Sequence, residues 1–162
     1  MEQYFQNIYT SSIPKEEDVF NVVSKVQNKL SQERAMDLDR PFTAAEVKEA
    51  VFGTGCTKSS GPDCFHVIFF QQMWGVIGAQ VMRVCLSILN GQASIAALNV
   101  TNIVLIQKAK NPQKVTEYRP ISLCNVLYKF VTKAIANHLK HHLMSLVSNN
   151  QSTFLPGKAQ HR

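Results

Sequence analysis

The spacing of hydrophobic residues predicts a mainly helical chain. Apolar positions recur every three or four residues over 15–30, the pattern of an amphipathic helix. A second helix is predicted over 43–52, because Thr43 and Glu46 form a T-x-x-E capping box and Gly53 follows the last apolar position. The polar stretch 31–41 between these helices ends at a proline, so we predict a linker there.

Two more helices are predicted between residues 64 and 90. The first begins near Cys64 with Asp63 as its N-cap, and because it is apolar on nearly every side we expect it to be buried. The second carries apolar residues from Val81 to Leu89 and should end at Gly91.

The pattern then changes to that of a β-hairpin followed by a long helix. Residues 99–106 and 118–123 predict two strands around a basic tip, the first strand buried on both faces at its end. The final helix should run from Val126 to about Val147. One face should carry Leu127, Val131, Ile135, Leu139, Leu143 and Leu146, and another Lys129, Lys133 and Lys140.

These elements define an α+β fold class that is mainly helical with one antiparallel β-hairpin. A length of 162 residues fits one compact domain. No apolar run is long enough to span a membrane, and the first residues lack the features of a secretory signal. We therefore expect an intracellular protein of the nucleus or cytoplasm that is not secreted and does not act at a membrane.

Charge is distributed unevenly along the chain. Residues 1–63 hold seven Lys/Arg and ten Asp/Glu, a net charge of −3, whereas residues 64–162 hold ten Lys/Arg and one acid, Glu117, a net charge of +9. A segment that basic is typical of a protein that binds a polyanion, and nucleic acid is the favoured partner. The alternative is a solvated basic surface with no partner.

The same asymmetry limits the possible chemistry. Two-metal phosphoryl transfer needs clustered carboxylates, and beyond Asp63 only Glu117 and the C-terminus supply one. His138, His141 and His142 share helical spacing, but the H-E-x-x-H pattern is absent. We therefore predict no metal site and no catalytic residue in this chain.

Several blocks resemble the reverse transcriptase of plant non-LTR (LINE-type) retrotransposons. LIQK at 105–108 and YRPISLCNVLYK at 118–129 resemble the family's LIPK and YRPISLCNVxYK. ANHLK at 136–140 resembles ANRLK, and QSTFLPGK at 151–158 resembles QSAFxPGR. Upstream, PFTAAEV at 41–47 resembles PFTxxEV, and SGPD at 60–63 resembles the PGPDG loop. The blocks follow one another in the family's order. Departures include Gln107 for Pro and His138 for Arg, as expected of relaxed constraint.

The resemblance implies that this chain forms the fingers and first palm helix of a right-hand RNA-directed DNA polymerase. The chain would then stop before the aspartates that bind Mg²⁺. In that family a Lys and an Arg of the fingers hairpin approach the triphosphate of the incoming deoxynucleotide, and Lys108 and Arg119 match those positions. RNA template and DNA primer would be the other partners. Lys129, Lys133, Lys140, Gly157 and Lys158 are further candidate contacts.

The resemblance also suggests how the chain is organised. Residues 1–40 would be a helical lead-in and linker, and residues 41–162 a partial reverse transcriptase domain. The complete family enzyme uses Mg²⁺, but we expect this chain to hold none and to be inactive alone. A non-catalytic nucleic-acid-binding module and a non-functional retroelement relic are the alternatives.

Overall fold

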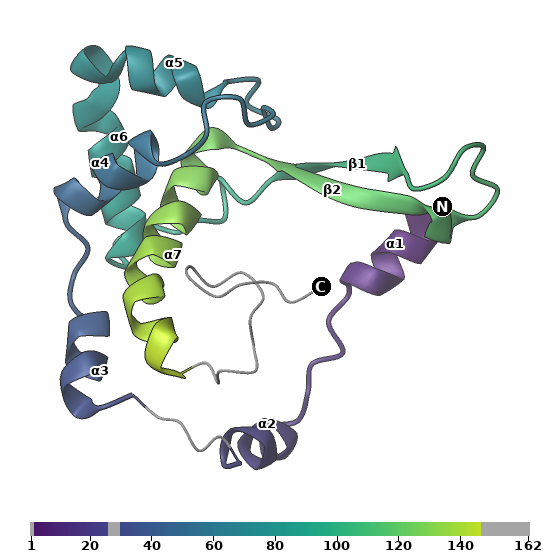
Figure 1. Cartoon of the computed structure of the whole chain (residues 1–162), viewed down its shortest axis with the longest axis horizontal. Coiled ribbons are helices and arrows are strands. Elements are labelled where there is room, and N and C mark those ends of the chain that lie inside the picture. The colour runs from purple at the N-terminus through teal and green to yellow at the C-terminus, as the bar shows by residue number, and fades with distance from the viewer. Residues whose placement is uncertain (1, 26–29, 147–162) are drawn as a thin grey trace. The chain divides into compact units, whose positions relative to one another are not determined.

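The computed structural model describes residues 2–25 and 30–146. Over these residues the chain forms seven α-helices, one short 3-10 helix and one two-stranded antiparallel sheet, which confirms the predicted fold class. Two compact units are present, one of residues 2–25 with 104–121 and the other of residues 30–103 with 122–146. Figure 1 labels the elements in chain order.

The first unit contains short helices and the end of the hairpin. Helices α1 (Glu2–Tyr9) and α2 (Glu16–Val23) bury no residue. The predicted helix over 15–30 is thus confirmed for residues 16–23, but its apolar side chains remain exposed, Phe20 at 72%. A 3-10 helix, η1 (Val115–Glu117), shapes the connection between the two strands.

The second unit has a hydrophobic core between three helices. Helices α4 (Ala44–Phe52), α6 (Trp74–Leu89) and α7 (Val126–Leu146) pack against one another, as Figure 1 shows. Their fully buried side chains include Val47, Val51, Cys85, Val126 and Phe130. Burying each large apolar side chain stabilises the fold by about 1.5–3 kcal/mol, so this cluster is its main source of stability.

The predicted helix ends in this unit are largely confirmed. The Thr43 hydroxyl accepts a hydrogen bond from the amide of Glu46, whose carboxylate accepts one from the amide of Thr43, and Gly53 ends α4. Gly91 adopts a φ of 73° just beyond α6, and the amides of Gly91 and Gln92 bond back to Ile88 and Ser87. This is the Schellman arrangement, which requires a residue that tolerates positive φ.

The predicted linker over 31–41 is wrong, because it contains helix α3 (Gln32–Leu38). The Ser31 hydroxyl accepts a hydrogen bond from the amide of Arg34, which satisfies one of the free donors of the first turn. Helix α3 buries none of its own residues, so its sequence has no apolar periodicity that would predict a helix.

The helix predicted to begin near Cys64 starts later and is interrupted. Helix α5 (Val67–Gln72) has His66 at its N-cap position, and α6 begins anew after Met73. Only Val67 and Phe70 of α5 are buried, whereas Ile68 and Phe69 are 43% and 39% exposed. The expectation of a fully buried helix was therefore wrong, because a six-residue helix presents only one side to the core.

The hairpin strands are confirmed, but the burial of the first one is not. Strand β1 (Thr101–Gln107) pairs with β2 (Tyr118–Cys124), and residues of β1 are exposed except for half-buried Leu105. The sheet has only these two strands among the described residues, so neither strand is flanked on both edges by another strand. Its apolar residues therefore stay in contact with solvent.

Helix α7 has the predicted length but a different buried face. The buried positions recur every four residues at Val126, Phe130, Ala134, His138 and His142, with Val131 beside them. Ile135 and Leu143, predicted to line the apolar face, are 39% and 38% exposed. The predicted face counted only aliphatic positions, whereas His138 and His142 also belong to the buried row.

Candidate nucleic-acid interface

The hairpin tip, defined here as residues 108–119, carries both predicted nucleotide contacts, Lys108 and Arg119. Lys108, Lys110, Lys114 and Arg119 are all exposed there. The amide of Lys108 donates to the carbonyl of Glu117 at 2.7 Å, which places these two residues opposite each other. Because side chains alternate along a strand, Arg119, two residues beyond Glu117, falls on the same face of the hairpin as Lys108.

The two predicted nucleotide contacts differ in what holds them. The Lys108 ammonium donates to the carbonyl of Thr116 at 2.7 Å, so its side chain folds back over the tip. The Arg119 side chain makes no hydrogen bond or ion pair with another residue of the described ranges. Both side chains are open to solvent, and the exposed guanidinium retains all its donors for a bidentate contact with an anion.

Glu117 organises the backbone of the tip. Its Oε2 atom accepts hydrogen bonds from the amides of Gln113 at 2.6 Å and Lys114 at 3.1 Å, and its own amide donates to the carbonyl of Lys114. Asn111 adopts a φ of 55°, a conformation that asparagine tolerates better than most residues. Glu117, the one acidic residue of 64–162, thus already accepts hydrogen bonds from backbone amides.

The three candidate lysines of α7 do not form one open row. The Lys129 ammonium donates to the carbonyl of Ser59, and Lys129 is half-buried. The half-buried side chain of Lys133 lies near Gly53 at the C-terminal end of α4. Lys140 alone of the three is exposed. Gly157 and Lys158 lie outside the described residues.

Three motif residues outside the hairpin hold the fold together. Asp63 Oδ2 accepts a hydrogen bond at 2.7 Å from the amide of Val126, so this side chain caps α7 rather than the predicted helix near Cys64. Asn125 accepts one from the amide of Asp63 and donates to the carbonyl of Leu98. At Gly61 a Cβ would lie 2.3 Å from the carbonyl carbon of Cys124, so only glycine fits.

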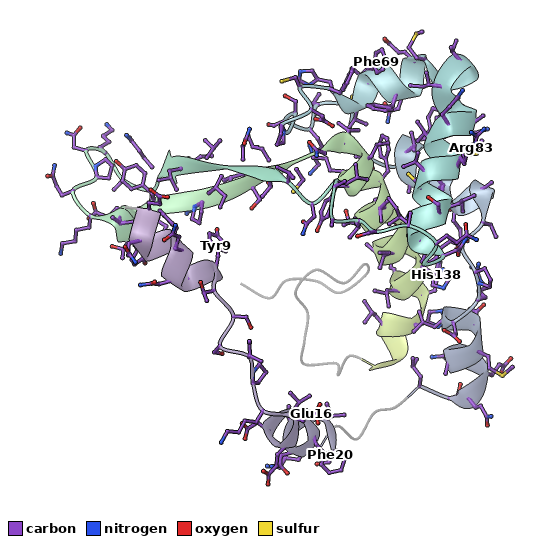
Figure 2. The ribbon with its side chains drawn as sticks, turned by 180° about the vertical axis from the view of Figure 1, so that it is seen from behind. Tyr9, Glu16, Phe20, Phe69, Arg83 and His138 are labelled. Carbon is purple, nitrogen blue, oxygen red and sulfur yellow. The ribbon has the colours of Figure 1, made fainter. Side chains whose placement is uncertain are left out.

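A polar cluster that the sequence did not reveal joins α3, α4 and α7. Buried His138 places Nδ1 2.9 Å from Glu46 Oε1 and Nε2 3.1 Å from the carbonyl oxygen of Leu38 (His138 is labelled in Figure 2). Arg40 forms a bidentate pair with Glu46 and a further contact with Asp37. Hydrogen bonding from Arg40 lowers the pKa of Glu46 to about 2, opposed by burial and assisted by Thr43 and His138.

His142 extends this cluster. Its Nε2 atom lies 3.4 Å from Asp37 Oδ2, one helical turn beyond His138. The four-residue spacing of two histidines was the available sequence signal, since it matches the rest of the buried row of α7. It did not identify their carboxylate partners, which lie 92 residues earlier for His138 and 105 residues earlier for His142.

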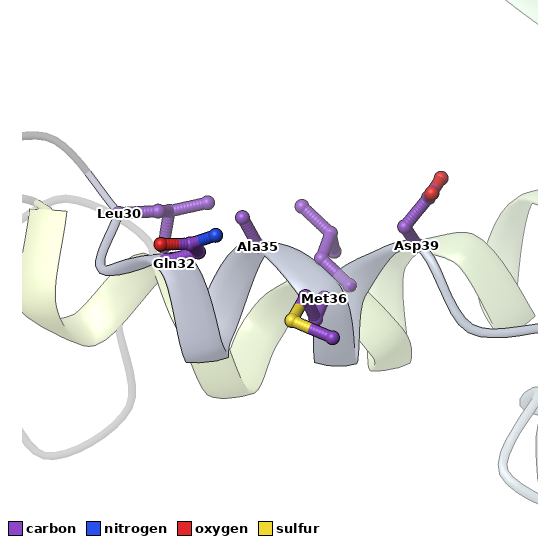
Figure 3. A pocket seen from close by; sticks show the side chains of 6 residues that line it. Leu30, Gln32, Ala35, Met36 and Asp39 are labelled. Atoms are coloured by element: carbon purple, nitrogen blue, oxygen red, sulfur yellow. The ribbon is translucent and has the colours of Figure 1, made fainter.

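The remaining features offer little for chemistry. Within the described ranges, no three His, Cys, Asp or Glu side chains are placed to hold a metal ion. Burial raises the pKa of the Cys85 thiol to about 11, which disfavours the reactive thiolate. A surface groove of about 420 Å³ beside α3 is mostly apolar (Figure 3). No helix among the described residues is long and apolar enough to cross a membrane.

Comparison with known proteins identifies a distant relative. No protein-family model matches the chain. The chain is 29% identical over 130 residues to a Xenopus laevis protein named "Transposon TX1 uncharacterized 149 kDa protein". The similarity covers 80% of this chain but 10% of that protein, so the chain is similar to a small part of a transposon protein.

Proposed function

We propose that this chain is part of an RNA-directed DNA polymerase, the reverse transcriptase of a non-LTR retrotransposon. The observation that carries the proposal is the order of the polymerase-like blocks over residues 41–158, supported by similarity to a transposon protein over 130 residues. The mainly helical fold with one basic β-hairpin is compatible with the fingers and first palm helix of a right-hand polymerase.

In this proposal the hairpin tip contacts the phosphates of the incoming deoxynucleotide. Arg119 supplies a planar fork of donors that matches phosphate oxygens, and Lys108 supplies a compact charge on the same face. Lys108 must exchange its hydrogen bond with Thr116 for one with phosphate, or use its remaining donors. RNA template and DNA primer lie against other basic positions, of which Lys140 is the most accessible candidate on α7.

The proposal assigns no chemical step to this chain. Two Mg²⁺ ions serve the complete family enzyme, but the residues at hand do not fit such a site, because Glu117 is bound to two backbone amides and Asp63 caps α7. Residues 41–162 correspond to the polymerase part and residues 1–40 to a helical lead-in. The chain therefore binds nucleotide and nucleic acid without joining them.

Two measurements test this function. Fluorescence anisotropy with a labelled RNA–DNA primer–template should show binding that weakens steeply between about 50 mM and 200 mM salt. Addition of a deoxynucleoside triphosphate that pairs with the next template base should shift the NMR signals of Lys108 and Arg119. A mispaired triphosphate is the matched ligand control. Primer extension by the pure chain with Mg²⁺ would contradict the assignment of a non-catalytic part.

A non-catalytic nucleic-acid-binding module is the second candidate function. The observation that favours it is the set of exposed cations at the hairpin tip, which requires no nucleotide site. This function predicts salt-dependent binding of single-stranded RNA with no added effect of the paired triphosphate. The triphosphate experiment thus separates the two candidates.

A further inference from the structure

We propose that Glu117 is a positioning residue of the hairpin tip: its carboxylate fixes the backbone that presents Lys108, Lys114 and Arg119 to phosphate. The inference rests on the proposed function, because it assumes that the tip binds a polyanion. It assigns a role to the one acidic residue between positions 64 and 162.

The geometry supports this role through contacts on both sides of the tip. The Glu117 carboxylate accepts from the amides of Gln113 and Lys114, which closes the return of the chain into η1. The Glu117 carbonyl accepts from the amide of Lys108 at 2.7 Å, which ties the outgoing strand to the incoming one. We call the two hydrogen bonds that the Glu117 carboxylate accepts the clamp. Glu117 therefore links this clamp to the backbone hydrogen bond with Lys108.

The clamp also acts on a predicted nucleotide contact. Glu117 and Lys114 are the ends of the turn that contains Thr116, and the Thr116 carbonyl accepts the hydrogen bond from the Lys108 ammonium. If the carboxylate no longer holds Gln113 and Lys114, the direction of the Thr116 carbonyl is no longer fixed. The position of the Lys108 ammonium, which donates to that carbonyl, is then no longer fixed either.

Electrostatics alone makes the opposite prediction. Glu117 carries a negative charge among four exposed cations, and such a charge weakens attraction to a polyanion. Removing it should therefore tighten binding if Glu117 contributes only its charge. Removing it should weaken binding if Glu117 positions the tip. The sign of the effect separates a positioning role from a simple charge.

The experiment measures the affinity of the full chain for a fluorescently labelled deoxynucleoside triphosphate that pairs with the next template base, in the presence of unlabelled RNA–DNA primer–template. Glu117→Ala removes the charge and both hydrogen bonds, and Glu117→Gln removes the charge but keeps a side chain of the same length. Glu117→Asp keeps the charge and shortens its reach. Glu49→Gln, at an exposed position of α4, is the matched control for loss of a negative charge.

We expect Glu117→Ala and Glu117→Asp to bind about fivefold more weakly, the effect of releasing a pre-ordered charged segment, with Glu117→Gln between them and the wild type. The Ala and Asp variants should also show a shallower dependence on salt, because a disordered tip neutralises fewer phosphates at once. Hydrogen exchange of the Gln113 and Lys114 amides should accelerate in both. The Glu49→Gln control should bind like the wild type.

Two outcomes overturn the inference in different ways. If Glu117→Ala binds as tightly as the wild type or more tightly, the positioning role is wrong while the proposed phosphate contact stands. If the wild-type chain does not bind the triphosphate at low salt, the proposed contact itself is wrong and the inference falls with it. A cooperative thermal unfolding transition unchanged from the wild type shows that a weakened variant still has its helical core.

Discussion

The hairpin tip and the helical core use polar motif residues in opposite ways. In the core, Asp63 and Asn125 each satisfy a distant backbone group, so their identity is explained by the fold. At the tip, the exposed Arg119 side chain makes no hydrogen bond or ion pair with another described residue. A motif residue that the fold explains gives little information about function, whereas one that the fold leaves available is the better candidate for binding.

The largest effect should come from the centre of the core. Phe130 is fully buried on α7 and contacts the ring of Phe70 edge-on, with ring centres 5.5 Å apart. Phe130→Ala should lower the free energy of unfolding by about 3–5 kcal/mol, because it leaves a cavity between α4, α6 and α7. Urea denaturation followed by circular dichroism measures this loss. A loss below 1 kcal/mol would mean that the three helices do not share one core.

The next prediction compares two glycines. Gly61→Ala should destabilise the fold by about 2–3 kcal/mol, because the new Cβ meets the backbone of Cys124 and Asn125, which cannot move independently. Gly75→Ala in α6 is the matched control, since its Cβ would meet nothing within 4 Å. The control should stabilise α6 by about 0.5–1 kcal/mol. Equal effects in denaturation would contradict the close approach at Gly61.

The polar cluster between α3, α4 and α7 should make stability sensitive to acid. The pKa of Glu46 is lowered from 4.5 to about 2 in the folded chain, chiefly by Arg40. Its contribution, about 2 kcal/mol, is fully present above about pH 4.5 and is lost as the pH falls through about 2. Denaturation across this pH range should show the loss in the wild type. In Glu46→Gln the stability should be lower at neutral pH, and this part of the acid dependence should disappear.

His138 should contribute less to stability than Glu46. Both ring nitrogens face acceptors, the Glu46 carboxylate and the Leu38 carbonyl, so a neutral ring can satisfy only one of them. The other charged groups of the cluster are Arg40 and Asp37, with His142 on the same helix, and the single charge of α6, Arg83, is exposed. We expect His138→Gln to cost about 1 kcal/mol in urea denaturation, because it removes hydrogen bonds that the buried ring makes. No loss of stability would contradict a stabilising role for these hydrogen bonds.

The comparison of tip and core also explains which features the sequence could predict. Thr43, Glu46 and Gly91 act through neighbours within a few residues, so their caps were visible in the sequence. Asp63 was assigned to the wrong helix because its partner, Val126, is 63 residues away. The candidate contacts Lys108 and Arg119 came from a resemblance. The hydrogen bond that holds the Lys108 ammonium depends on the direction of the Thr116 carbonyl, which no sequence pattern encodes.

The smallest predicted effect on stability tests whether a change at the tip can alter binding without altering the stability of the core. Arg119→Gln removes one exposed charge but no side-chain hydrogen bond or ion pair with another described residue, so the free energy of unfolding should change by less than about 0.5 kcal/mol. In the presence of primer–template, its affinity for the paired deoxynucleoside triphosphate should fall about threefold to tenfold, and the salt dependence should become shallower by about one phosphate contact. Lys48→Gln, at an exposed position of α4, is the matched control and should leave affinity nearly unchanged, because a general loss of positive charge would affect both variants alike. Equal weakening in the two variants would mean that net charge, and not a specific position on the hairpin, attracts the triphosphate. A selective loss in Arg119→Gln with unchanged stability would identify a residue that the fold does not need and the ligand does.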